Sequence, residues 1–100
     1  MSMPSVPVVG IAWYRPESYG QVMELMADGA SFPKSHASWR QKAGRMEREL
    51  KRQGNQPVRV EVNPTVFAGW CKDREFPADS EARARFVAEA VAARHYSVAG

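Results

Sequence analysis

The segment Ala12–Tyr19, with the sequence AWYRPESY, gathers the side chains of this chain that are best suited to bind a small anion. Arg15 comes directly before Pro16, a residue typical of the first position of a helix, and a cation at a helix N-terminus opposes the helix dipole. An anion held by the Arg15 guanidinium and by the first helical N–H groups would remove this conflict. Large aromatic side chains nearby would wall the site. The candidate ligand corner consists of Trp13, Tyr14, Arg15 and Tyr19.

A structural interpretation of the same residues is favoured over the anion site. The Arg15 guanidinium can stack on a neighbouring aromatic ring or pair with Glu17, and neither arrangement binds a ligand. Pro16 and Pro64 lie 48 residues apart, and each follows an apolar stretch at the point where a helix pattern begins. We therefore predict that YRP and VNP are strand ends that turn into helix starts.

A second candidate site is the basic stretch from Lys34 to Arg59, which carries eight basic and two acidic residues, a net charge of +6 against +3 for the whole chain. Projected on a helix, three arginine side chains fall opposite the apolar stripe, and a lysine flanks them. They form a basic ridge of Arg45, Arg48, Lys51 and Arg52. Arginine suits phosphate and carboxylate groups, so nucleic acid or another polyanion is an alternative partner.

The favoured interpretation of the basic ridge is a solvated helix face. No recognised nucleic-acid motif accompanies it. Glu47 with Lys51, and Arg45 with Glu49, are spaced to form ion pairs along such a face.

Catalytic and metal-binding chemistry find little support in the sequence. The single cysteine, Cys71, falls in the apolar stripe of a predicted helix, where cysteine acts as a small buried hydrophobe rather than as a nucleophile. The two histidines, His36 and His95, form no metal-ligand pattern, and no nucleotide-binding or hydrolase motif is present. We therefore expect no metal, no cofactor and no catalytic residue, and we lean towards a protein that is not an enzyme.

Hydrophobic periodicity predicts two strands and four helices. The stretch 8–14 is apolar on both alternating sets, which indicates a strand covered on both faces, whereas 58–62 alternates strictly and has one wetter face. Helices are expected from Pro16 or Ser18 to about Asp28, from a Ser35 cap to Gly54, from an Asn63 cap through Cys71, and from Asp79 or Ser80 to about His95.

The last predicted helix carries two further features. Arg83 falls on the same side as the apolar stripe, near the helix start, and is interpreted as a packing residue. The other side is smooth, with small residues that indicate a docking face or simply good helix propensity. These are Ala84, Ala88 and Ala92.

The predicted fold is an α+β domain of order β-α-α-β-α-α that spans residues 1–100, with residues 1–6 and 97–100 as flexible ends. Two strands make a weak sheet, and the first of them needs cover on both faces. The four helices provide that cover within one chain, or the strands of two chains combine into one four-stranded sheet in a homodimer. We favour the homodimer.

The function that remains is a small protein-interaction or regulatory module that associates with itself or with another protein. We expect it inside the cell, in the cytoplasm, because no apolar run is long enough to span a membrane and no secretory signal pattern precedes the first strand. The Arg- and Ala-rich composition favours a bacterial origin. The alternatives are polyanion binding through the basic ridge and a small anionic ligand at the ligand corner.

Overall fold

The computed structural model describes residues 6–96, which form an α+β domain of the predicted order β-α-α-β-α-α. Short 3₁₀ helices flank the first α-helix. The elements are Val8–Trp13 (β1), Pro16–Ser18 (η1), Tyr19–Leu25 (α1), Gly29–Ser31 (η2), His36–Arg52 (α2), Gln56–Glu61 (β2), Pro64–Arg74 (α3) and Ser80–Tyr96 (α4). Of the ends that the sequence predicts to be flexible, residues 1–5 and 97–100 lie outside the described residues, and Val6 is exposed.

Local side-chain chemistry sets the helix ends, much as the sequence predicts. The Ser35 hydroxyl accepts a hydrogen bond at 3.1 Å from a backbone N–H in the first turn of α2, and Gly54, with a φ of 91°, follows its end. The Asn63 side chain accepts two such bonds at the start of α3. At the start of α4, the Asp79 carboxylate accepts one from Ala82 at 3.0 Å.

The first predicted helix is shorter than the sequence indicates. A 3₁₀ helix and α1 replace one continuous helix, and α1 ends at Leu25 rather than near Asp28. Met26 has extended backbone with a ψ of 135°, and Ala27 donates its N–H to the Ala78 carbonyl at 2.7 Å. This hydrogen bond draws the chain out of the helix and ties it to the segment before α4.

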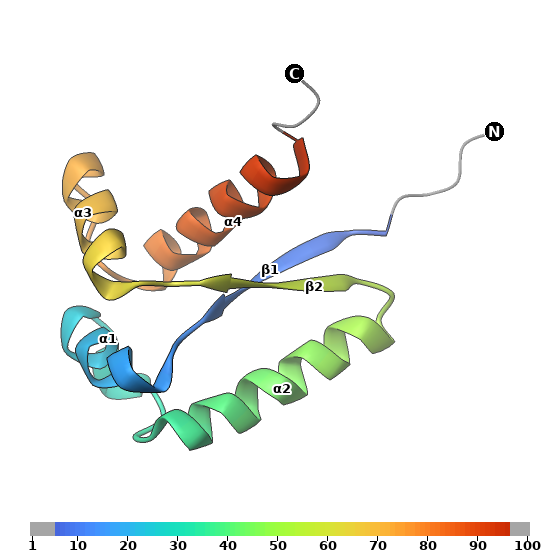
Figure 1. Cartoon of the computed structure of the whole chain (residues 1–100), viewed down its shortest axis with the longest axis horizontal. Coiled ribbons are helices and arrows are strands. Elements are labelled where there is room, and N and C mark those ends of the chain that lie inside the picture. Colours follow the sequence, from blue (N-terminus) through green and yellow to red (C-terminus); the bar gives the residue numbers. More distant parts are fainter. Residues whose placement is uncertain (1–5, 97–100) are drawn as a thin grey trace.

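The two strands lie side by side as a parallel pair. Their register joins Val8 to Gln56, so each β1 residue faces the residue 48 positions later, the spacing that also separates Pro16 from Pro64. Both strands therefore end at the same side of the molecule, where each leads into the helix that its proline begins (Figure 1).

Helices α4 and α2 lie on opposite faces of this small sheet, as Figure 1 shows. Gly10 allows α4 to approach β1 closely, since a Cβ atom at this position would lie 2.4 Å from Val87 Cγ1 and 2.7 Å from Val91 Cγ2. On the other face, the Trp13 ring centre lies 4.9 Å from that of Trp39 in α2. The first strand is thus covered on both faces, as its sequence predicts.

The core gathers between the sheet and the helices that follow the strands. Phe67, Val22 and Val62 are the largest side chains that are fully buried. Cys71 belongs to the same cluster, and burial raises the pKa of its thiol. A protonated, buried thiol is a packing residue, in agreement with the interpretation of its sequence position.

Candidate functional site

The free edge of β1 carries unpaired backbone groups. In the described chain the sheet has two strands, so each strand has one edge without a partner. The carbonyls of Pro7 and Trp13 accept hydrogen bonds at 2.8 and 2.9 Å from the β2 side. Successive residues of a strand point their N–H and C=O groups to opposite edges. The groups that point away from β2 therefore belong to Val8, Gly10 and Ala12.

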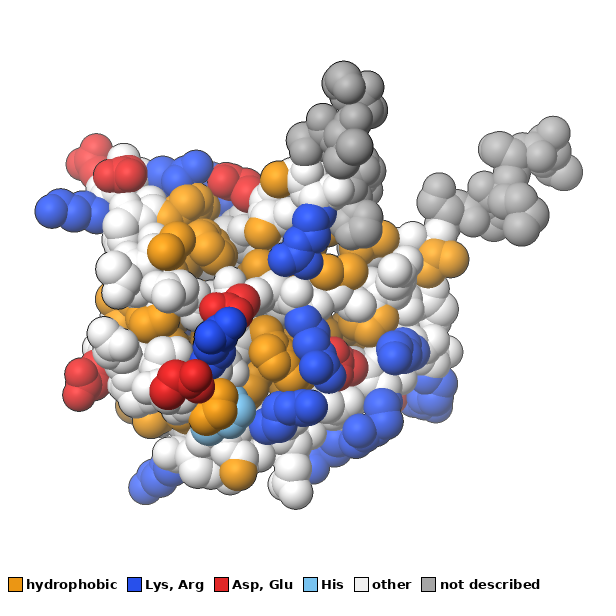
Figure 2. Space-filling view, viewed as in Figure 1, with side chains coloured by type: hydrophobic (Ala, Val, Ile, Leu, Met, Phe, Trp, Pro, Cys, Tyr) orange, Lys and Arg blue, Asp and Glu red, His pale blue; other side chains and the backbone are white. Residues whose placement is uncertain are grey.

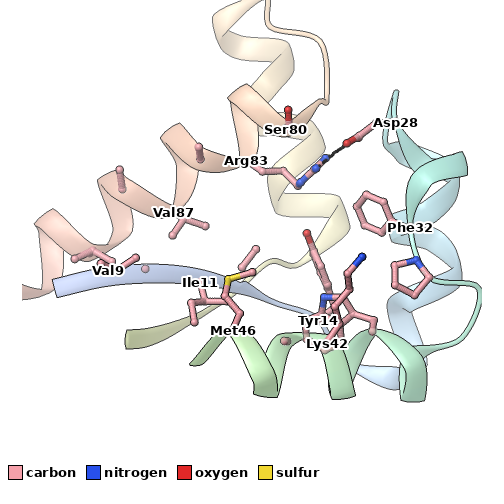
Figure 3. A pocket seen from close by; sticks show the side chains of 18 of the residues that line it. Val9, Ile11, Tyr14, Asp28, Phe32, Lys42, Met46, Ser80, Arg83 and Val87 are labelled. Carbon is pink, nitrogen blue, oxygen red and sulfur yellow. Dashed lines mark hydrogen bonds and ion pairs between the residues drawn. The ribbon is translucent and has the colours of Figure 1, made fainter. Parts of the chain in front are cut away.

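A groove of about 840 Å³ runs along this edge, between α4 and α2. Its volume lies at the upper end of the range of ordinary ligand pockets. Figure 3 shows Val87 of α4 and Met46 of α2 on opposite sides of β1. The three alanines of the smooth face of α4, Ala84, Ala88 and Ala92, line the groove as well. Charged side chains line it only at one end, so its middle is apolar.

The polar end of the groove is built around an ion pair between α4 and the segment after α1. Arg83 donates two hydrogen bonds to the Asp28 carboxylate, at 2.7 and 2.8 Å, and its guanidinium lies 4.9 Å from the Phe32 ring centre. These bonds hold the pKa of Asp28 below its usual value. The Arg83 side chain is only 15% exposed, so the pair is partly shielded from water.

Tyr14 and Lys42 complete this polar end. Figure 3 shows the Tyr14 hydroxyl directed towards the Arg83 guanidinium. Burial of the ring raises the pKa of Tyr14 to about 12, so the hydroxyl stays protonated and can donate a hydrogen bond at neutral pH. Lys42 adds an exposed ammonium group from α2. The groove therefore offers backbone pairing and apolar walls along its length, and hydrogen-bond donors at one end.

The free edge of β2 differs from that of β1. By the same alternation, its outward backbone groups belong to Pro57, Arg59 and Glu61. Pro57 has no N–H group to offer. The Arg59 carbonyl accepts a hydrogen bond at 3.3 Å from the Arg94 guanidinium of α4. Proline and charged side chains are common devices that keep an edge strand from pairing, so this edge is protected.

Of the ligand corner predicted from the sequence, the structure brings the rings of Tyr14 and Tyr19 together, with centres 6.2 Å apart, but the four residues do not all line the groove. Tyr14 and Tyr19 are buried, at 4% and 3% exposure, and of the four residues only Tyr14 lines the groove. Trp13 lies beneath the Arg59 guanidinium, at 3.9 Å from its ring centre. Arg15 pairs with Glu61 at 3.0 Å, rather than stacking on an aromatic ring or pairing with Glu17. The parallel register explains this partner, because it places the end of β2 beside the end of β1.

The basic ridge lies on the exposed side of α2, and Figure 2 shows blue side chains gathered along this part of the molecule. The expected pairs along the helix are not those that form. Glu47 pairs with Arg59 of β2 at 2.6 Å, and Glu49 with Arg52 at 2.6 Å. Tertiary structure explains the first, because β2 brings Arg59 to the flank of α2. Hydrogen bonding from Arg59 also lowers the pKa of Glu47.

These pairings leave part of the basic ridge without acidic partners in the described structure. Arg45 and Arg48 form no ion pair there, and with Arg40 they line a shallow hollow on α2. The hollow lies over Gly44, where a Cβ atom would sit 3.5 Å from an Arg48 guanidinium nitrogen and 3.8 Å from one of Arg40. Arg52 is engaged with Glu49, and Lys51 is exposed.

Sequence reasoning missed the groove but recognised one of its walls. The smooth side of α4 is the signal that was visible, and it does face the groove. Arg83 pairs with a carboxylate 55 residues away, which no local pattern could indicate. Its interpretation as a packing residue therefore needs correction, because its main contact is the Asp28 ion pair. Which backbone groups of β1 face outwards depends on its pairing and register with β2, and the periodicity of the two strands specifies neither.

Comparison with known proteins yields no match among family models, curated proteins or solved structures. Within residues 6–96, none of the helices is long and apolar enough to cross a membrane. The same part of the chain places no three His, Cys, Asp or Glu side chains where they could share a metal ion.

Proposed function

We propose that this chain is a small protein-interaction module that binds an extended protein segment by adding it as a strand to the free edge of β1. The observation that carries the proposal is the position of the unpaired backbone groups of Val8, Gly10 and Ala12 inside a groove with apolar walls. Strand addition derives its affinity from backbone hydrogen bonds and its specificity from pockets for alternate side chains. β1 offers the free backbone groups, and the groove offers apolar walls for the side chains.

The chemistry of the groove defines the segment that fits. A strand beside β1 would direct alternate side chains towards α4 and towards α2. Because the middle of both walls is apolar, side chains of both sets must be apolar. A segment of this kind is a protein strand rather than a small polar ligand or a nucleic acid. The absence of catalytic activity, the cytoplasmic location and the bacterial origin stay predictions from the sequence.

A synthetic peptide tests the edge on its own. The probe is a peptide with the sequence of residues 6–14 flanked by lysines, titrated into the labelled full chain while backbone amide NMR signals are recorded. We expect saturable shifts at Val8, Gly10 and Ala12, because the peptide would pair with their N–H groups in competition with any second copy of the chain that occupies the edge. The β2 edge serves as the internal reference, and Arg59 and Glu61 should shift little.

Two methylated peptides provide matched controls. N-methylation at the peptide positions that correspond to 8, 10 and 12 removes the donors that face the chain, and we expect binding to weaken at least about tenfold. N-methylation at 9, 11 and 13 removes donors that face outwards and should have a smaller effect. Equal weakening by both, or shifts outside β1 and its groove, would count against strand addition.

A second candidate function is binding of a polyanion by the basic ridge. The observation in its favour is the cluster of Arg40, Arg45 and Arg48 over Gly44, in which Arg45 and Arg48 have no acidic partner in the described structure. Guanidinium groups that gather without carboxylates suit phosphate oxygens.

The salt dependence of binding to a double-stranded DNA oligonucleotide tests this candidate. Replacing Arg45 and Arg48 by Gln should reduce the slope of log K against log salt by about one unit for each phosphate group that the variant no longer neutralises. Arg52→Gln is the matched control, because Arg52 already pairs with Glu49 and should change the slope less. Binding whose affinity does not change with salt would exclude the candidate.

A further inference from the structure

We infer that the strand which occupies the groove is β1 of a second copy of this chain, paired antiparallel across a twofold axis to form a four-stranded sheet of order β2-β1-β1-β2. This inference rests on the proposed function and names its partner. A closed twofold dimer is the commonest assembly of small proteins. The β1 edge is the surface that can pair with itself, because the β2 edge is blocked by Pro57 and by the Arg94 contact to Arg59.

The register of such a pair follows from which backbone groups are free. In an antiparallel ladder, residues that face each other across a hydrogen-bonded site exchange both N–H···O bonds. A twofold axis at Gly10 joins Gly10 to the partner's Gly10 and Val8 to the partner's Ala12. This register uses every outward backbone group of β1, whereas a shift by two residues leaves some unpaired. It is therefore the register of largest hydrogen-bond gain.

The side chains of β1 match the two walls of the groove. In this register Val9 faces the partner's Ile11 on the α2 side, and both are apolar. On the α4 side the twofold axis passes Gly10, where a Cβ atom would meet Val87 and Val91. Gly10 and Ala12 carry no side chain long enough to hold the two α4 helices away from the centre of the sheet. β1 thus has the apolar pattern on both faces that the groove requires.

The helices explain why a whole second copy fits better than a single strand. A stable dimer buries roughly 800 Å² per partner, more than a strand edge of six residues supplies alone. Ala84, Ala88 and Ala92 are exposed on the groove side of α4, and Met46, on the other wall, is 51% exposed. A second copy brings its own α4 and α2 against these surfaces, so helix pairs cover both faces of the completed sheet.

The oligomeric state of the full chain, by light scattering coupled to size exclusion, tests the inference. We expect a dimer as the main species at about 0.5 mM, at both low and high salt, since the middle of the interface is apolar, and the dimer fraction should rise with protein concentration. Ala88→Glu should shift the population to monomer, because it places a charge on the shared α4 surface. Ala37→Glu is the matched control: the same change on an exposed helical position outside the groove should leave the dimer intact.

A second pair of variants addresses the backbone directly. Ala12→Pro removes an outward N–H from β1 without removing a bond to β2, and Pro57 shows that a strand of this sheet accommodates proline. We expect this variant to fold, by circular dichroism, and to be monomeric. Glu61→Pro makes the same change at the edge of β2 and should remain a dimer.

The possible outcomes separate the inference from the function on which it rests. A monomeric wild type overturns the homodimer, and so does a dimer that survives both Ala88→Glu and Ala12→Pro. In either case the peptide titration still decides whether the β1 edge accepts a strand. A monomer that binds the peptide would keep the interaction module with a different partner, and a monomer that does not bind it would end both proposals.

Discussion

The two edges of one small sheet differ in nearly every property that controls strand pairing. β2 directs Pro57, Arg59 and Glu61 outwards, and an arginine from α4 occupies one of its carbonyls. β1 directs Val8, Gly10 and Ala12 outwards, into a groove between two helices. Protection of an edge therefore depends on which residues turn their backbone outwards and on which side chain reaches over it, not on the overall polarity of the sheet.

This difference gives the sheet a direction of growth. In the proposed function it extends beyond β1, where a partner would find backbone donors, acceptors and apolar walls, and it stops at β2. An assembly with one open and one closed edge ends at two copies, because pairing of the open edges leaves only closed ones outside.

The largest effect is expected from Gly10→Val, which attacks the close approach of α4 to β1. The added side chain would overlap the methyl groups of Val87 and Val91. We expect the free energy of unfolding to fall by about 1 to 3 kcal/mol, as for other overpacked positions, and the groove to be distorted. Urea denaturation followed by circular dichroism measures this change.

Gly69→Ala is the matched control for that substitution. Gly69 lies in α3, where nothing would come within 4 Å of a Cβ atom, and alanine is the better helix former. We expect a gain in stability of about 0.5 to 1 kcal/mol. Equal stability of Gly10→Val and wild type would show that α4 is not held tightly against β1.

Arg83→Met tests the ion pair that holds α4 at the polar end of the groove, and we expect a loss of about 1 kcal/mol near neutral pH. The pKa of Asp28 is lower in the folded than in the unfolded chain, so its stabilising contribution is present above about pH 4 and is lost as the pH falls. The variant should therefore show a weaker loss of stability in acid. Glu47 retains its own lowered pKa in both proteins, so its contribution cancels in the comparison. If the wild type and the variant lose the same stability in acid, the Asp28–Arg83 ion pair does not have this role.

Tyr14→Phe tests the hydroxyl at the same end, and at neutral pH we expect a change within about 0.5 kcal/mol. The pKa of Tyr14 is raised to about 12, so between roughly pH 10 and 12 the unfolded chain loses this proton first and wild-type stability falls. The variant should lose less stability than the wild type between neutral pH and about pH 10.5. The midpoint of urea denaturation, measured for both proteins at both pH values, tests this. If the wild type and the variant lose the same stability at alkaline pH, the pKa of Tyr14 is not raised by folding.

The smallest change in stability is expected from the double variant Pro57→Val and Arg94→Ala, which opens the protected edge. It gives β2 an outward N–H and frees the Arg59 carbonyl, at a cost within about 0.5 kcal/mol. With both edges open, the sheet should grow, and light scattering should detect species larger than those of the wild type. A mass distribution identical to that of the wild type would mean that another feature closes this edge.

The parts of the fold that local chemistry controls were predictable from the sequence. Ser35, Gly54 and Asn63 mark helix ends because a capping side chain or a left-handed glycine acts on its own neighbours. The early end of α1 was not predictable, because it depends on a hydrogen bond from Ala27 to Ala78, far along the chain.

The candidate site could be predicted less well than the helix ends, because it too depends on contacts between residues far apart in the chain. The alanines of α4 showed a smooth surface but not what lay opposite it. Arg83 and Asp28, and Arg59 and Glu47, meet only once the parallel pairing has set α2 and α4 on opposite faces. A groove is a property of that arrangement, and side-chain periodicity within one element carries no information about it.

The parallel pairing of β1 and β2 also affects how the chain folds. Parallel strands cannot be joined by a tight turn, so residues 14–55 must be placed before the first ladder bond can close. During synthesis β1 leaves the ribosome well before β2 exists, with neither of its edges satisfied. Until β2 has been made, β1 of another unfinished chain can pair with this strand in its place. Rapid, clustered translation would therefore favour aggregation through the six residues of β1.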